Sequence, residues 1–242
     1  MTARATRTVG IIGGMGPEAT CLLFQRIIRA TPARRDQDHL HVIINCDPSV
    51  PDRTAALVAG GESPVASLVA SAQLLERAGA HLLAMPCVTA HAFVEPVRRA
   101  VGVPLVSLVE ETARAVNEQC GHARCVGLLA TDGTVRSGVF GCLGERRQLI
   151  VPEAAQQAEV MAAIYGPRGV KTVGPNAEAS RRMAAVAADL VRRGAEAIVA
   201  GCTEVPLALA AGDVAMPLMD TLDVLARAVV REATGACGGR TL

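Results

Sequence analysis

The sequence predicts an α/β fold made of two pseudo-symmetric three-layer α/β domains with mainly parallel sheets and a cleft between them. Short apolar runs of strand length alternate with alanine-rich stretches of helical length, and 50% of the 242 residues are hydrophobic. Near-continuous apolar strands separated by helices indicate parallel sheets that are covered on both faces. The chain also repeats its own pattern of strands and glycine turns, which indicates two copies of one α/β unit.

Apolar segments rich in β-branched residues or leucine are predicted to be strands. They are Val9–Ile12, Val42–Asn45, His81–Met85, Cys125–Ala130, Gln148–Val151 and Ala197–Ala200. Alanine-rich segments with helical periodicity lie between or after them. They are Pro17–Ala30, Val65–Ala78, Glu110–Gln119, Glu153–Ile164, Ala177–Arg193 and Asp220–Ala233.

Two pairs of similar segments carry the internal repeat. The strand and glycine turn at residues 9–16 resemble those at residues 126–133. The strand that leads into Cys87 resembles the one that leads into Cys202. Both pairs occur in the same order and at nearly equal separation, which is what two copies of one unit produce.

The repeat also predicts the division into domains. The break between the copies falls after Val103-Pro104, and the last helix is expected to return to the first unit. We therefore predict a first α/β domain of residues 1–104 and 220–242, and a second of residues 105–219.

Composition and charge exclude several classes of partner. The net charge is +1, charged residues of both signs are interspersed, and aromatic residues make up 2% of the chain. Neither a basic face nor stacking platforms for nucleic acid are therefore expected. The apolar run Val9–Ile12 is too short for a signal peptide, and no run approaches a membrane span. We expect a cytoplasmic protein that binds neither nucleic acid nor membranes.

The 8 cysteines are scattered, without a Cys-x-x-Cys pair. Disulfide frameworks belong to short secreted chains, so most of the cysteines are expected to be small core residues. This interpretation covers Cys21, Cys46, Cys120, Cys125, Cys142 and Cys237. Cys87 and Cys202 differ, because each follows a predicted strand and precedes residues that start a helix.

The position of Cys87 and Cys202 indicates a reaction. Ligands of open parallel sheets bind beyond the carboxyl ends of the strands. A thiol at a helix N-terminus is near the positive end of the helix dipole, so we expect the pKa of each thiol to be lowered. Two thiols that face one cleft from opposite sides can remove a proton from one face of a carbon and supply one to the other. A buried core thiol is the alternative for either cysteine alone.

Several motifs resemble the aspartate/glutamate racemase superfamily, and its aspartate racemase branch in particular. They are Gly13-Gly-Met-Gly-Pro-Glu-Ala-Thr20, Pro51-Asp-Arg-Thr54, Met85-Pro-Cys-Val-Thr-Ala-His91, Leu129-Ala-Thr-Asp-Gly-Thr134, Ile164-Tyr165 followed by Lys171, and Gly201-Cys-Thr-Glu-Val-Pro206. The resemblance implies a racemase of aspartate or a related acidic amino acid that uses no pyridoxal phosphate (PLP) or other cofactor. It also implies a homodimer, with Cys87 and Cys202 as the catalytic pair.

The candidates for substrate binding are Met15, Arg53, Val88, Thr89, Thr131, Gly133, Thr134, Lys171 and Thr203. Glycines around Met15 let the backbone approach a carboxylate at a helix N-terminus. Each threonine either donates to the substrate carboxylate, which gains charge as the α-proton leaves, or caps a helix. Arg53 and Lys171, the only lysine, resemble the pair that grips the side-chain carboxylate in aspartate racemases.

Three further polar residues have open roles. Glu204 and His91 follow the two cysteines and either tune the thiols, face solvent or cap helices. Asp52 either orients Arg53 or forms a turn. Cys87 and His91 have the spacing of two metal ligands, but further ligands are not evident, so no metal site is predicted.

Val88 departs from the family pattern, which normally has asparagine directly after the first cysteine. Valine offers the substrate no amide and narrows the cleft, so it affects the choice of substrate more than the proton transfer. Two alternatives therefore stay open. One is an isomerase that acts on another dicarboxylate or amino acid with the same scaffold. The other is a protein that binds a small carboxylate without turnover.

Overall fold

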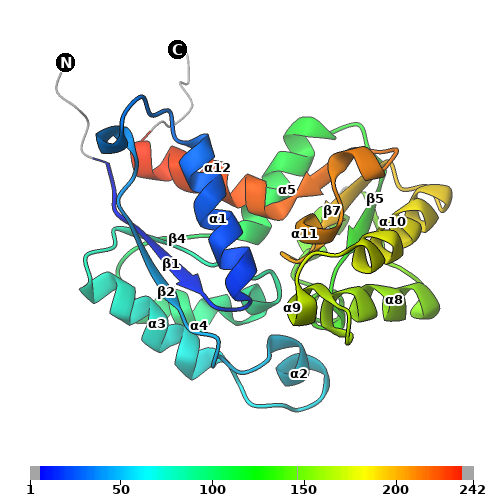
Figure 1. The fold of residues 1–242 in the computed structure, drawn as a ribbon, viewed down its shortest axis with the longest axis horizontal. Coiled ribbons are helices and arrows are strands. Elements are labelled where there is room, and N and C mark those ends of the chain that lie inside the picture. Colours follow the sequence, from blue (N-terminus) through cyan, green and yellow to red (C-terminus); the bar gives the residue numbers. More distant parts are fainter. Residues whose placement is uncertain (1–5, 146, 236–242) are drawn as a thin grey trace.

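The computed structural model describes residues 6–145 and 147–235, which form two four-stranded parallel sheets flanked by helices (Figure 1). The strand order is β2-β1-β3-β4 in the first sheet and β6-β5-β7-β8 in the second, so the two sheets share one topology. The strands are β1 (Val9–Gly13), β2 (Val42–Cys46), β3 (Leu82–Ala84), β4 (Leu105–Val106), β5 (Cys125–Leu129), β6 (Gln148–Ile150), β7 (Ala197–Ala200) and β8 (Leu218–Asp220).

Helices connect the strands. The α-helices are α1 (Pro17–Ala30), α2 (Arg53–Val58), α3 (Val65–Arg77), α4 (Val94–Ala100), α5 (Leu108–Gln119), α6 (Asp132–Ser137), α7 (Gly141–Gly144), α8 (Ala154–Tyr165), α9 (Val170–Val173), α10 (Ala177–Arg192), α11 (Val205–Ala208) and α12 (Thr221–Thr234). The 3-10 turns are η1 (Asp36–Asp38), η2 (Thr89–Phe93) and η3 (Ala211–Asp213). Among the described residues, no helix combines the length and the apolar character that crossing a bilayer requires.

The predicted fold class, two α/β units with parallel sheets, is confirmed, and every predicted strand is present. The sequence does not predict β4 and β8, which have 2 and 3 residues, because a helix follows each of them within one residue and obscures the strand pattern. The predicted helix at Glu110–Gln119 begins earlier, at Leu108. Ser107 caps this helix by accepting a hydrogen bond from the Glu110 backbone N–H.

Both faces of each sheet are covered by helices, as expected for parallel strands. Val9 and Ile11 of β1 belong to a buried cluster that includes α1 and α12, whereas Ile12 belongs to a second cluster beneath α3. Helices α8 and α10 cover the outer face of the second sheet. Helix α12 follows β8 of the second sheet but packs against α1 and α5 (Figure 1). The domain limits stay a prediction, and residues 236–242, with Cys237, lie outside the described residues.

The expectation that the remaining cysteines are core residues is wrong for several of them. Cys21, Cys46 and Cys142 are exposed, whereas Cys120 is buried and Cys125 is half-buried. Cys21 lies on the outer side of α1, and Cys46 ends the edge strand β2, so no further element covers them. An apolar run in the sequence does not reveal which of its side chains face outward.

The strands β3 and β7 place Cys87 and Cys202 at equivalent positions. Each is the third strand of its own sheet along the chain, and each pairs with the first strand of that sheet. β3 ends at Ala84, shortly before Cys87, and β7 ends at Ala200, shortly before Cys202. Both cysteines therefore lie at the carboxyl ends of parallel strands, where such sheets bind ligands.

Candidate active site

Cys87 and Cys202 line one small cavity between the two sheets, which we call the inner cavity. Its volume is about 10 Å³. It is lined by Met15, Arg53, Cys87, Val88, Thr89, Thr131, Tyr165, Lys171, Cys202, Thr203 and Glu204. Both cysteines are 5% exposed. A space of this size holds about one water molecule, so its walls must move before an amino acid can lie between the thiols.

His91 fixes the loop that carries Cys87. Its Nδ1 lies 2.8 Å from the carbonyl oxygen of Cys87, and its Nε2 accepts a hydrogen bond from the Leu108 backbone N–H at 3.2 Å. Because Nε2 accepts, the ring proton lies on Nδ1, which donates to the carbonyl. Burial lowers the pKa of His91 to about 4, so the ring is neutral near pH 7. His91 therefore contacts the backbone of Cys87, and it does not line the inner cavity.

Cys202 is held by a carboxylate. Its Sγ donates to Glu204 Oε2 at 2.9 Å, and the same oxygen accepts from the Thr203 hydroxyl at 3.2 Å. Burial raises the pKa of the Cys202 thiol well above its ordinary value, and the charge of Glu204 adds to this effect. The expectation of a lowered pKa is therefore wrong for Cys202. The helix that follows, α11, has only 4 residues, so its dipole is too small to offset burial.

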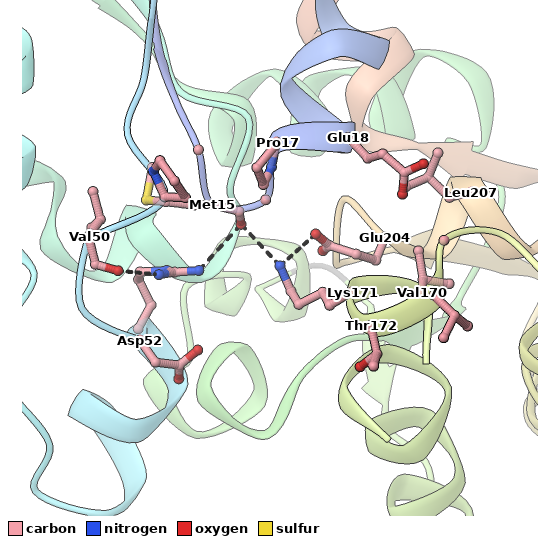
Figure 2. A pocket seen from close by; sticks show the side chains of 16 residues that line it. Met15, Pro17, Glu18, Val50, Asp52, Val170, Lys171, Thr172, Glu204 and Leu207 are labelled. Carbon is pink, nitrogen blue, oxygen red and sulfur yellow. Dashed lines mark hydrogen bonds and ion pairs between the residues drawn. The ribbon is translucent and has the colours of Figure 1, made fainter. Parts of the chain in front are cut away.

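Two cations hold the backbone carbonyl of Met15 (Figure 2). Arg53 Nη2 lies 3.4 Å and Lys171 Nζ lies 3.2 Å from this oxygen. Lys171 also forms an ion pair with Glu204, with 2.6 Å between Nζ and Oε1. Burial alone would lower the pKa of Lys171, but the charge of Glu204 outweighs it and raises the pKa. The only lysine thus connects the loop after β1 with the loop after β7.

Arg53 lies at the start of α2 and is 8% exposed. Its Nη1 donates to two backbone carbonyls of the preceding turn, each at 3.0 Å. Burial alone would lower the pKa of Arg53, but nearby negative charge, first that of Cys87, raises it. Asp52 is the N-cap of α2, where it accepts a hydrogen bond from the Ala55 backbone N–H at 2.7 Å. Arg53 therefore supplies a permanent positive charge beside Cys87.

A larger cavity, which we call the outer cavity, lies against the inner one and has a volume of about 690 Å³ (Figure 2). This volume is typical of small-molecule sites. Met15, Arg53, Lys171 and Glu204 line both cavities, and we call these four residues the shared wall. Their hydrogen bonds and ion pair therefore separate the thiols from the larger space.

Three threonine hydroxyls meet where the two halves of the chain touch. Thr89 Oγ1 lies 3.0 Å from Thr131 Oγ1 and 2.8 Å from Thr134 Oγ1. Thr131 also caps α6, because its hydroxyl accepts a hydrogen bond from the Thr134 backbone N–H. Thr89, Thr131 and Thr203 line the inner cavity, whereas Thr134 does not and instead contacts Thr89 and Thr131. Thr131 is thus a helix cap that also borders the cavity.

Gly133 allows α6 to approach the first half of the chain closely. A Cβ at this position would lie 2.9 Å from Thr54 Cα and 2.9 Å from Thr89 Cγ2. We expect Gly133→Ala to force α2 and α6 apart and to lower the free energy of unfolding by about 1–3 kcal/mol. Urea denaturation measures this loss. Gly141→Ala is the matched control, because nothing lies within 4 Å of a Cβ there. Equal losses in both variants would contradict the close approach.

Tyr165, which has no predicted role, also lines the inner cavity. Its hydroxyl donates to Asp52 Oδ2 at 3.2 Å, and Lys171 Nζ lies 5.7 Å from the centre of its ring. Burial raises the pKa of Tyr165, so the hydroxyl stays protonated. Tyr165 is the only tyrosine of the chain, and this rarity is the sequence feature that could have identified it as a site residue.

The structure brings together most of the predicted site residues. The exceptions are His91, Gly133 and Thr134, which do not line the inner cavity. His91 and Thr134 instead hold residues that do. In residues 6–145 and 147–235, no three His, Cys, Asp or Glu side chains are grouped so that they could hold a metal ion.

Known proteins resemble this chain over nearly its whole length. The sequence model of the Asp/Glu/Hydantoin racemase family matches residues 12–229. The broad specificity amino-acid racemase RacX of Bacillus subtilis (strain 168) is 26% identical over 232 residues, which cover 92% of this chain and 96% of RacX.

Solved structures show the same similarity. The aspartate racemase of Picrophilus torridus is 28% identical, with a TM-score of 0.82 over 94% of each chain. An aspartate racemase homologue from Pyrococcus horikoshii OT3 is 26% identical, with a TM-score of 0.73 over 94% of this chain and 99% of that one. The family match includes both cysteine loops and the whole shared wall. The chain therefore belongs to the Asp/Glu/Hydantoin racemase family.

Proposed function

We propose that this protein is a cofactor-independent amino-acid racemase in which Cys87 and Cys202 exchange protons with the α-carbon of the substrate. The observation that carries the proposal is that the two thiols, one from each sheet, line a single buried cavity. Inversion by two bases needs a proton acceptor on one side of a carbon and a proton donor on the other. Membership of a racemase family supports the same reaction.

The reaction proceeds by two proton transfers. One cysteine thiolate takes the α-proton, and the electron pair of the broken C–H bond passes into the α-carboxylate. The other thiol then gives its proton to the opposite face of the carbon, so that the first sulfur ends as a thiol and the second as a thiolate. Thr89, Thr131 and Thr203 border the cavity and are the proposed donors to the carboxylate as its charge increases.

We propose aspartate or a related acidic amino acid as the substrate. Arg53 and Lys171 are the cations that border the inner cavity, and both bind the Met15 carbonyl. A carboxylate on the substrate side chain would replace that carbonyl and form stronger, charge-assisted hydrogen bonds. The similarity to the aspartate racemase of Picrophilus torridus supports this choice. The homodimer and the cytoplasmic location, which the sequence analysis expected, stay predictions.

Val88 is the observation that supports a second candidate function, a protein that binds a small carboxylate without turnover. Val88 is 1% exposed, packs in the apolar core and borders the inner cavity directly beside Cys87. It offers no hydrogen bond to a substrate at the position where the family normally has an amide. An isomerase of another dicarboxylate or amino acid on the same scaffold is the third candidate.

Incubation with each enantiomer of aspartate in deuterated water separates these candidates. Racemisation is expected to place deuterium at Cα while optical purity is lost. The chain has one tyrosine, Tyr165, and no tryptophan, so tyrosine fluorescence reports ligand binding at the site in the same samples. Binding of aspartate without exchange would identify a binding protein. Exchange with another amino acid, but not with aspartate, would identify a different substrate.

A further inference from the structure

Glu204 uses both of its carboxylate oxygens inside the site. Oε1 forms the ion pair with Lys171 at 2.6 Å, and Oε2 accepts from Cys202 Sγ at 2.9 Å. The side chain of Glu204 is 4% exposed, so little water reaches its two oxygens. Of the carboxylates in the described ranges, it alone lines the inner cavity. Its position is therefore fixed from two sides.

The two thiols differ in the charged group nearest to them. Cys202 faces the carboxylate of Glu204, with Lys171 and the neutral Tyr165 as the other titratable groups near it. Cys87 instead shares the lining of the inner cavity with the guanidinium of Arg53, and Lys171 and Tyr165 are the other titratable groups near it. A negative neighbour favours the neutral thiol, and a positive neighbour favours the thiolate. The pseudo-symmetry of the fold thus does not extend to the charges around the two sulfurs.

We propose that Glu204 is a positioning residue that keeps a proton on Cys202, so that in the resting protein Cys202 is the proton donor and Cys87 the proton acceptor. The consequence for turnover rests on the proposed racemisation, whereas the protonation of Cys202 does not. The resting protein is ready for the enantiomer whose α-proton points towards Cys87. Turnover breaks the C–H bond towards Cys87 and the S–H bond of Cys202, and it leaves Cys87 as the thiol and Cys202 as the thiolate.

Alkylation of the two thiols by iodoacetamide tests the protonation directly, because only the thiolate reacts. The two sites are quantified by mass spectrometry in the same molecules. A motion that opens the site and exposes both thiols therefore does not change the ratio of Cys202 to Cys87 labelling. We expect Cys87 to be labelled first. Glu204→Gln keeps the size of the side chain but removes its charge, and it is expected to raise the ratio at least about tenfold. Glu159→Gln, on the surface pair with Arg182, is the matched control and leaves the ratio unchanged.

Lys171→Met separates the charge of Glu204 from a loosening of the site. This variant also breaks the ion pair, but it leaves the carboxylate unopposed beside Cys202, so the labelling ratio is expected to fall. A loosened site would raise the ratio in both variants, and that result would overturn the proposal. A ratio that stays within about twofold in both folded variants would overturn it as well. If Glu204→Gln does not fold, Lys171→Met decides alone: a lower labelling ratio supports the proposal, and a higher ratio overturns it.

Rapid-quench measurements then connect the protonation to turnover. In the unmodified protein, one enantiomer is expected to convert in the first turnover without delay, while the other shows a lag. Glu204→Gln is expected to reduce this difference. Absence of conversion with both enantiomers, together with an altered labelling ratio, would refute the proposed racemisation but not the role of Glu204. Conversion with equal onset for both enantiomers in the unmodified protein would refute that role.

Discussion

Replacing Cys87 or Cys202 with serine is expected to lower the rate of racemisation by about 10³-fold or more. A serine hydroxyl has nearly the same size, but it neither ionises near neutral pH nor transfers a proton at a comparable rate. Positioned acid–base groups contribute about 10²–10⁴-fold to such reactions, and the two-base reaction needs both groups. Chiral chromatography of the product measures the rate for each enantiomer in each variant.

The two serine variants are expected to differ in the enantiomer that still exchanges deuterium. Each keeps one thiol, so deuterium exchange without inversion is expected to persist for the enantiomer whose α-proton faces the remaining cysteine. Cys142→Ser is the control, because Cys142 is exposed and borders neither the inner nor the outer cavity. A Cys87 or Cys202 variant that racemises within about tenfold of the unmodified protein would contradict the two-thiol reaction.

Removing the imidazole of His91 is expected to lower the free energy of unfolding by about 2–4 kcal/mol at pH 7. His91→Ala leaves the carbonyl of Cys87 and the N–H of Leu108 buried without the partner that joins them. Each unsatisfied buried backbone group costs about 1–3 kcal/mol. Urea denaturation at pH 7 measures the loss. His122→Ala is the control, because His122 is exposed, and an equal loss there would contradict the bridging role.

The same imidazole is expected to make stability depend on pH. The pKa of His91 is about 4 in the folded protein, against 6.5 for an ordinary histidine. Between these values the unfolded chain binds a proton that the folded protein does not. The contribution of His91 is therefore fully present above pH 6.5 and decreases as the pH falls towards 4, by about 3 kcal/mol in all. Urea denaturation of the unmodified protein and of His91→Ala gives their difference in free energy of unfolding at pH 7 and at pH 4.5. This difference is expected to be smaller at pH 4.5, and an equal difference at both pH values would contradict the role of His91.

Much of the fold could be predicted because the strands are apolar and bounded by glycine or polar turns. Helix α1 occupies Pro17–Ala30, as predicted, with proline in its first turn. The short strands β4 and β8 could not be predicted, because pairing with an inner strand, rather than local pattern, makes them strands. The exposed cysteines show the same limit, since burial depends on neighbours that are distant in sequence.

The candidate site could be predicted as a set of residues, but not as a set of interactions. The internal repeat distinguishes Cys87 and Cys202 from the other cysteines, and Lys171 is distinguished as the only lysine. The sequence does not show that Lys171 pairs with Glu204, because 33 residues separate them and only the folded chain joins them. The pKa of Cys202 was misjudged for the same reason. Helix position is a local property, whereas burial and a neighbouring carboxylate are properties of the packed structure.

The packing of α12 against α1 has a consequence for the synthesis of the chain. Helix α1 is complete at Ala30, but the helix that covers it begins only at Thr221. At about 5–20 residues per second, a ribosome needs roughly 10–40 s to make the segment between them. The second sheet, with α8 and α10, is complete when β8 ends at Asp220. Helix α1, although it is synthesised early, is thus covered by α12 only when the end of the chain has been made. During that interval the apolar side of α1 is open to aggregation and to chaperones.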